Sequence, residues 1–402
     1  MADPSIITGV RNTGNLNSTF FRPDWERKLH LIEPGHTPFF ENLFFSEKIA
    51  SQVVTSKTGR FDIGEDQYVP ALAAVTANFA GGAVTGTISV TVGQEVAFKK
   101  YDVIYLETSD TSARLTADPV AGSGQLVVSS LDGVTNLGAV NSGDNVISLG
   151  GMVNEYGGVP TSITTIPTNV FNYTSITTAS VSSTGTEQSG ESWTDGLEHR
   201  DQVKKTILWL KQQVELKLLL SPALARASVD NYYANQTKGV LGFINTNKQS
   251  YQGVLTKDIW DNFLQQVFTS KGATDTKTVY GGSQAIAEVT AVMDQKLTRL
   301  QKADDYIVKL GAKAVGYMSP FGFVNIVWDP MMIGKFSKYF IVVDEPSLKL
   351  RYQGPDLKGP RRFRVEPNVE TPGYDGKVDK ILMHVGIEVA NEEKFGVLYR
   401  TA

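Results

Sequence analysis

One stretch of this chain, WTDGLEHRDQVKKTILWLKQQVELKLLLSP at residues 193–222, constrains the fold more than any other. Apolar side chains recur there every three or four residues, which predicts one long helix with a single apolar face. They are Val203, Ile207, Leu210, Val214 and Leu218. A helix of about 25 residues would span about 40 Å. Thr194 or Asp195 can cap its start and Pro222 ends it, so we interpret the segment as a structural spine.

Length, cysteine content and charge exclude several classes of protein. The chain has 402 residues, enough for two or three domains, and no cysteine, which excludes disulfides and thiolate chemistry. No apolar run reaches the roughly 18 residues of a membrane span, and no signal peptide is evident, so we expect a cytosolic protein without membrane contact. The net charge of −4 divides into −9 for residues 1–192 and +5 for residues 193–402, which disfavours tight DNA binding.

Residues 1–58 carry many large apolar side chains but no long element, because Pro and Gly residues interrupt them. The large apolar residues are Phe20, Phe21, Trp25, Leu29, Leu31, Phe39, Phe40, Leu43, Phe44 and Phe45. Such a segment cannot bury its own aromatic groups, each of which contributes about 1.5–3 kcal/mol when buried. We therefore expect an N-terminal arm that lies on the rest of the chain or on a neighbouring subunit.

Two polar, extended segments flank a region of short strands. Residues 59–92 alternate loosely, and residues 159–192 are rich in Ser and Thr, so we expect the two to pair as the sides of one extended loop. The region between them, residues 93–158, contains strand-like runs separated by Asp-Pro, Asp-Gly and Gly-rich turns. This pattern predicts a small all-β insertion domain.

After the spine the pattern becomes mixed α/β. Helical periodicity is present in TKDIWDNFLQQVFTSKG and in SQAIAEVTAVMDQKLTRL, with a short strand between them. AVGYMSPFGFVNIVW predicts a hairpin around Ser319 to Gly322. ILMHVGIEV alternates, which places Ile381, Met383, Val385, Ile387 and Val389 on a buried strand face.

The strongest enzymatic candidate is Ser283 in VYGGSQA. Gly281-x-Ser283-x-Ala285 between a strand and a helix resembles a nucleophile elbow without its last glycine, and His384 follows in the order of a serine hydrolase triad. A serine after two glycines is also typical of a helix N-cap, which is the interpretation we prefer. The four histidines, His30 and His36 included, have no ligand spacing, so no metal site and no cofactor are expected.

Two charged clusters have no catalytic interpretation. Asp62, Glu65 and Asp66 form an acidic cluster in the first half of the chain. A basic segment in the second half contains Lys349, Arg351, Lys358, Arg361, Arg362 and Arg364. The basic side chains could meet phosphate, the acids of a partner or only solvent.

The order of these elements is similar to that of a known family. Segments that carry the resemblance are PGHTPFFENLF, NVFNYTSIT, MSPFGFVNIVWDPMM, VDEPSLKLRY and GIEVANEEKFGVLYR. Together they resemble the major capsid proteins of tailed bacteriophages, whose fold is named after phage Hong Kong ninety-seven. The resemblance covers nearly the whole chain and implies an α+β fold with an arm, an extended loop, a peripheral domain that holds the spine helix, and an α/β axial domain.

The resemblance also implies domain bounds and partners. It predicts a peripheral domain of residues 193–230 and 336–380 and an axial domain of residues 231–335 and 381–402. It implies a virion protein that assembles in the host cytoplasm into hexamers and pentamers of an icosahedral shell, which encloses double-stranded DNA without reading its sequence. No catalysis is required. A separate scaffolding protein, a portal and decoration proteins are the expected partners.

Two other function classes stay open at this point. A phage tail or decoration protein could share the β-rich first half but would not need the α/β block, and a serine hydrolase would need Ser283. In the capsid interpretation, the extended loop of one subunit lies over the peripheral domain of the next. We therefore expect intersubunit contacts between Asp62, Glu65 and Asp66 on one side and Lys358, Arg361, Arg362 and Arg364 on the other.

Overall fold

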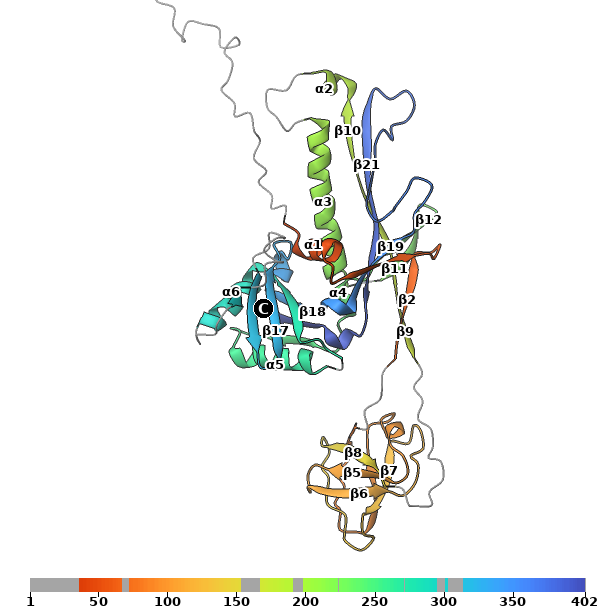
Figure 1. Cartoon of the computed structure of the whole chain (residues 1–402), viewed down its shortest axis with the longest axis vertical. Coiled ribbons are helices and arrows are strands. Elements are labelled where there is room, and N and C mark those ends of the chain that lie inside the picture. Colours follow the sequence, from red (N-terminus) through yellow and green to blue (C-terminus); the bar gives the residue numbers. More distant parts are fainter. Residues whose placement is uncertain are drawn as a thin grey trace, which may run out of the picture. The chain divides into compact units, whose positions relative to one another are not determined.

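The structure is a computed structural model of the 402-residue chain, and it describes residues 36–66, 72–152, 167–190, 198–222, 224–270, 272–294, 301–302 and 314–401. The chain divides into two compact units (Figure 1). The first unit consists of Met1–Ile63 with Val170–Ala402, and the second consists of Gly64–Asn169. The first unit combines helices with strands and the second is almost entirely strands, so the predicted α+β class is confirmed.

The predicted spine is helix α3 (His199–Leu220). Leu210, Val214 and Leu218 are fully buried in the main core of the first unit, and Val203 and Ile207 pack against the same core. The apolar stripe therefore faces the protein as expected. Glu198 occupies the N-cap position without a side-chain bond, while the predicted caps at residues 194 and 195 lie outside the described residues.

A five-stranded sheet lies beside this helix. Its order is β1 (Ala50–Val54), β19 (Leu348–Gln353), β21 (Gly376–Val389) and β10 (Ser175–Thr184), with β20 (Arg364–Glu366) pairing with β21. Helix α3 packs along β10 and β21, as Figure 1 shows. The buried face predicted in β21 is confirmed, because its odd-numbered apolar residues from Ile381 to Val389 are at most 1% exposed. The opposite face, which holds His384 and Glu388, is buried as well.

The second sheet of the first unit has seven strands. Their order is β13 (Lys248–Tyr251), β22 (Gly396–Arg400), β18 (Tyr339–Val343), β14 (Thr276–Gly281), β17 (Gly322–Trp328), β16 (Ala314–Ser319) and β15 (Gln301–Lys302). The sheet is buried on both faces: Val279 packs with helices α5 (Lys257–Thr269) and α6 (Ser283–Asp294), and Tyr280 points into the core that contains α3. Ser319 pairs with Gly322, which confirms the predicted hairpin.

The described end of the N-terminal arm lies on its own chain. Helix α1 (Pro38–Phe45) buries Phe39, Phe40 and Leu43 in the core that also holds α3. The Phe39 ring meets the Tyr280 ring edge-on, with the ring centroids 5.2 Å apart. For these residues, the expectation that the arm lies on the rest of its own chain therefore holds. The large apolar residues of the arm before His36 lie outside the described part.

The extended loop is shorter than predicted. Strands β2 (Arg60–Glu65) and β9 (Thr168–Tyr173) pair with each other, which confirms that residues from the two polar segments form one ribbon. However, β3 (Leu72–Ala74) and β4 (Thr85–Ser89) belong to the sheet of the second unit, so the boundary predicted at residue 92 is wrong. The sequence pattern could not place this boundary, because polar and apolar residues alternate in the same way in a ribbon and in an edge strand.

The second unit is the predicted all-β insertion. Its sheet has the order β3, β8 (Asn145–Gly151), β5 (Asp102–Leu106), β6 (Thr111–Leu115), β7 (Gln125–Ser130) and β4. Val75 and Val90, which follow β3 and β4, form an antiparallel bridge, so the two edges of the sheet meet each other. Inward-facing apolar side chains, among them Ile88, Ile104 and Leu126, are fully buried.

Two of the predicted domain boundaries do not follow the sheets. The sequence places residues 336–380 with the spine, yet β18 lies inside the seven-stranded sheet. It also places residues 381–402 in the axial domain, yet β21 belongs to the five-stranded sheet beside α3. Both strands are buried on both faces along most of their length, so a periodic pattern cannot tell which sheet they join.

Candidate functional site

The six basic side chains found in the sequence lie on β19, on the loop that follows it and on β20. Two of them share one carboxylate within the five-stranded sheet. Lys349 lies opposite Glu388 of β21, with its Nζ 3.0 Å from a carboxylate oxygen, and Arg351 also pairs with Glu388. The other four lie in residues 354–366, which we call the basic loop.

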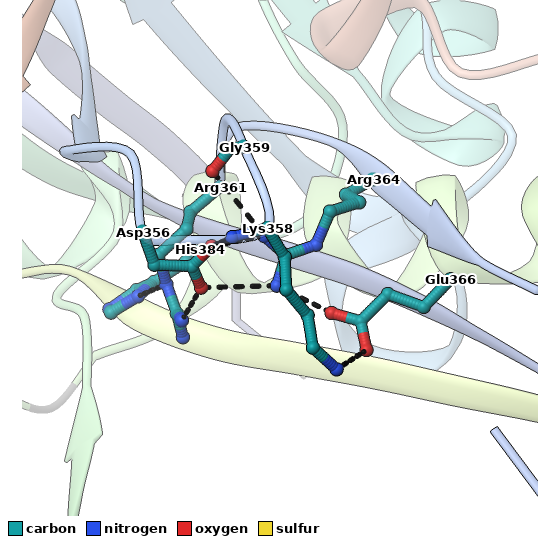
Figure 2. A network of polar contacts seen from close by, with 7 residues as sticks. All are labelled: Asp356, Lys358, Gly359, Arg361, Arg364, Glu366 and His384. Carbon is teal, nitrogen blue, oxygen red and sulfur yellow. Dashed lines mark hydrogen bonds and ion pairs between the residues drawn. The ribbon is translucent and has the colours of Figure 1, made fainter.

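The basic loop is organised around Asp356. Its backbone exchanges two hydrogen bonds with Gly359 (3.1 and 3.0 Å), and the φ of +111° at Gly359 is the left-handed conformation that glycine adopts at low cost. The Lys358 backbone N–H donates to Asp356 Oδ1 over 2.9 Å. These bonds close a tight turn and hold the carboxylate toward the arginines that follow (Figure 2).

Two arginines converge on this carboxylate. Arg361 Nη1 donates to Asp356 Oδ2 over 2.7 Å, and Arg364 donates to both oxygens, over 2.6 and 3.1 Å, in the paired geometry that suits a guanidinium. The Arg364 guanidinium holds the pKa of Asp356 well below its usual range. Arg364 also pairs with Glu366, whose second oxygen lies 3.4 Å from Lys358 Nζ. Ion pairs therefore hold the residues of the basic loop together.

His384 connects the loop to the base of the extended ribbon. Arg361 Nε donates to His384 Nδ1 over 3.2 Å, so Nδ1 must accept and Nε2 carries the proton. Nε2 lies 3.0 Å from Thr174 Oγ1, whose hydroxyl in turn donates to the Gly59 carbonyl over 3.3 Å. Burial, and then the charge of Arg361, lower the pKa of His384 to about 4. The imidazole is thus neutral at neutral pH.

Arg362 points to a different part of the fold. Its Nη2 donates to the Phe44 carbonyl over 2.7 Å, and its guanidinium lies 5.0 Å from the centre of the Phe44 ring. Because Phe44 belongs to the last turn of α1, the cation also meets the negative end of that helix. Arg362 therefore fastens α1 rather than joining the network around Asp356.

The acidic residues predicted from the sequence lie elsewhere. Asp62 is on β2 and pairs with Arg60, with Arg60 Nη2 2.6 Å from Oδ1; Glu65 ends β2 and Asp66 is exposed. None of the three contributes a carboxylate to the network drawn in Figure 2, whose acids are Asp356 and Glu366. Three cations of the basic loop meet its two carboxylates, and Arg362 adds a fourth positive charge, which leaves the loop with a net positive charge.

Sequence reasoning missed three residues of this network. Glu366 could have been found, because residues two apart on a strand share a face and Arg364 precedes it by two. Asp356 had a weaker signal in the turn sequence PDLKG. His384 had none, because its contact with Arg361 depends on the pairing of β20 with β21.

Among the residues that the structure describes, the candidate nucleophile Ser283 has no catalytic partner. Ser283 is exposed at the first position of α6. The Ile286 N–H donates to the Gly282 carbonyl over 3.0 Å, so Gly282 and not Ser283 holds the N-cap position, and our capping prediction is wrong by one residue. His384 already uses both ring nitrogens, with Arg361 and Thr174. It is not available as a base for Ser283.

The first testable prediction concerns Ser283. Ser283→Ala should change the free energy of unfolding by less than about 0.5 kcal/mol, because the side chain is exposed and does not cap the helix. Hydrolysis of activated esters should be the same in the wild-type chain and the variant. Ester hydrolysis that disappears in a folded Ser283→Ala variant would contradict this.

A second prediction concerns His384. Its folded-state pKa lies below the unfolded value, so the unfolded chain binds the proton first and stability falls as pH drops from about 6.5 to about 4. Over this interval the free energy of unfolding of the wild-type chain, measured with urea, should fall by about 2 to 3 kcal/mol more than that of His384→Gln. The control variant His36→Gln changes a residue outside the network and should keep the wild-type dependence of stability on pH. Equal slopes in wild type and His384→Gln would contradict the prediction.

The described residues form neither a metal site nor a membrane-spanning helix. No group of three or more His, Asp or Glu side chains in the described part could hold a metal ion. Among the described helices, none is long and apolar enough to cross a membrane.

One family model and several solved structures are similar to this chain. The family model described as SU10 major capsid protein matches residues 6–402. The capsid of a native GTA particle superposes with a TM-score of 0.51 at 9% identity, covering 97% of this chain and 98% of that one, which is a likeness of fold.

Two further structures match with lower scores. They are Mycobacterium phage Cain (TM-score 0.47, 8% identity, 98% and 99% covered) and the holo-SrpI encapsulin complex from Synechococcus elongatus (TM-score 0.44, 14% identity, 59% and 77% covered). No curated protein matches the chain.

Proposed function

Because the chain belongs to the SU10 major capsid protein family, we propose that its copies assemble into an icosahedral shell of hexamers and pentamers around the double-stranded DNA of a tailed phage. The resemblance seen in the sequence is confirmed, and the protein is a capsid shell protein. The observation that carries the proposal is the extent of the family match, which runs from residue 6 to the last residue. It includes both sheets of the first unit and the whole second unit.

Exposed apolar side chains support contacts between copies. The hairpin of β11 (Ala225–Val229) and β12 (Tyr232–Gln236) carries Val229, Tyr232 and Tyr233, which are 54%, 79% and 73% exposed. A two-stranded hairpin is only marginally stable by itself in water. A neighbouring subunit that covered these side chains would stabilise the hairpin and the assembly together.

We further propose that Asp62, Glu65 and Asp66 of one subunit face the basic loop of the next. The net positive charge of that loop and the rigidity that its ion pairs confer support this contact. Lys358, Arg361 and Arg364 already have acidic partners, so the contact would draw on the positive charge that the two loop carboxylates leave uncompensated. An exposed ion pair contributes only about 0–1 kcal/mol, but the same contact recurs at every symmetry-related interface.

The remaining partners follow from the family resemblance. We propose a portal, a separate scaffolding protein and decoration proteins, with the shell assembled in the host cytoplasm and carried in the virion. Enclosed DNA would be held without sequence recognition, and the chain would act without catalysis. The two other function classes, a tail or decoration protein and a serine hydrolase, are less consistent with the family match. A tail or decoration protein would not need both the α/β block and the spine.

The deciding experiment is electron microscopy of the protein expressed alone and together with a scaffolding protein from the same genome. We expect closed shells of uniform diameter in at least the second sample. Open tubes would favour a tail protein, and particles that stay monomeric under both conditions would contradict self-assembly.

A further inference from the structure

Two carboxyl side chains lie buried against each other beneath α1. Glu215 comes from α3 and Asp329 follows β17 directly, and they are 0% and 1% exposed. Glu215 Oε1 accepts the Phe39 backbone N–H over 3.2 Å, and Asp329 Oδ1 accepts the Met331 backbone N–H over 2.8 Å. Each carboxyl therefore uses one oxygen on a backbone amide.

The other oxygen of each group has no partner in the described structure. Glu215 Oε2 and Asp329 Oδ2 are both buried and unpaired among the described residues, and the charge of Asp329 disfavours ionisation of Glu215. Two ionised carboxylates could not satisfy each other, because neither has a proton to donate. One proton held between the two groups would satisfy both oxygens.

The pair forms the surface on which α1 begins. Pro38 is the first residue of α1 and Phe39 the second, so the Phe39 N–H that reaches Glu215 is one of the amides that the helix itself leaves unpaired. Phe39, Phe40 and Leu43 are buried in the core that also holds α3. A displacement of Glu215 therefore disturbs the first turn of α1 through the Phe39 bond.

We propose that Glu215 and Asp329 share one proton and act as a pH-sensitive latch, which holds α1 against the core when the proton is present and weakens its docking when the proton is lost. The latch is a property of the single subunit and does not depend on shell assembly.

Other charged groups around the latch do not neutralise a second negative charge. Glu41 on α1 and Asp329 both disfavour ionisation of Glu215. Tyr280 on β14 donates no bond to the pair and accepts one from Asn42, which also donates to Glu345. Among the nearby cations, Lys211 lies over the Phe40 ring and Lys48 pairs with Glu345.

The direction of the pH effect follows from where the proton is bound. Burial, and then the neighbouring Asp329, raise the pKa of Glu215 well above its usual value, and burial raises that of Asp329 to about 6. When α1 lifts, water reaches both groups and they return toward the usual carboxyl pKa of about 4. Docking of α1 is therefore strongest at low pH and weakens as pH rises. Between the usual carboxyl pKa and the raised pKa values, the equilibrium constant for docking falls by about tenfold per pH unit.

Hydrogen exchange of the intact chain tests the latch. Exchange in a peptide that covers residues 36–46 is measured by mass spectrometry between pH 5 and pH 8, with times adjusted for the pH dependence of intrinsic exchange. In wild type we expect protection to fall at least about tenfold between pH 5 and pH 7. In Glu215→Gln, which keeps an acceptor for Phe39 N–H but cannot ionise, protection should change less than about twofold.

Three comparisons keep the test decisive. Asp329→Asn should flatten the profile like Glu215→Gln, and it replaces that variant if the first one does not fold. Glu345→Gln, which removes a charge on the other side of α1, should keep the wild-type pH dependence. A flat wild-type profile, an equally steep profile in a folded Glu215→Gln variant, or parallel loss of protection in β22 would each overturn the proposal.

Discussion

Deletion of residues 1–45 is expected to destabilise the subunit by about 5 to 9 kcal/mol and to prevent shell formation. Three side chains of α1, Phe39, Phe40 and Leu43, are at most 2% exposed, and each contributes about 1.5–3 kcal/mol by its burial. The deletion also removes the Asn42 bonds to Tyr280 and Glu345. A loss of this size is comparable with the whole stability of many domains, so we expect a soluble but only partly folded chain.

Point substitutions separate the loss of α1 from the loss of the preceding residues. Phe39→Ala and Phe40→Ala should each cost about 3 to 5 kcal/mol, because each leaves a cavity in the core. Phe45→Ala is the matched control: its side chain is 62% exposed, and the cost should stay below about 0.5 kcal/mol. Stability is measured by urea unfolding and assembly by electron microscopy. Normal shells from the truncated chain would show that the arm is not needed.

The second large effect is expected from reversing charge in the basic loop. Replacing both Arg361 and Arg362 with Glu should stop assembly while circular dichroism still shows a folded chain. Arg361 would lose its bonds to Asp356 and His384, and Arg362 its bond to the end of α1, so internal effects must be distinguished from contacts between subunits.

Two rescue variants make that distinction. If the acidic residues of a neighbour face the loop, Asp62→Lys with Asp66→Lys should restore part of the assembly. If the effect is internal, Asp356→Lys should restore it instead, because Asp356 is the partner of Arg361 within the chain. Lys335→Glu with Lys338→Glu makes the same change of net charge elsewhere and should assemble normally. Full assembly of the Arg361→Glu, Arg362→Glu chain at low and moderate salt would rule out the proposed contact.

Local sequence patterns predicted most elements of the fold. The stripe of α3, the buried face of β21 and the hairpin at Ser319 to Gly322 each depend on residues close together in the chain, and all three are present. The β-rich insertion was also predicted, because closely spaced turns leave room only for short strands. These features were predictable because side-chain periodicity and turn chemistry are properties of a single segment.

Which segments meet was decided by the tertiary structure. β18 and β21 are buried on both faces along most of their length, so only their pairing assigned them to different sheets. The basic residues looked free in the sequence until the turn at Asp356 and the pairing of β20 with β21 gave Arg361 and Arg364 their partners. No sequence pattern indicated that Glu215 and Asp329 would meet, because a single acidic residue in a helix and another after a strand are both common. A shared proton requires two distant segments to exclude water from the same place, and this depends on three-dimensional packing that no local pattern encodes.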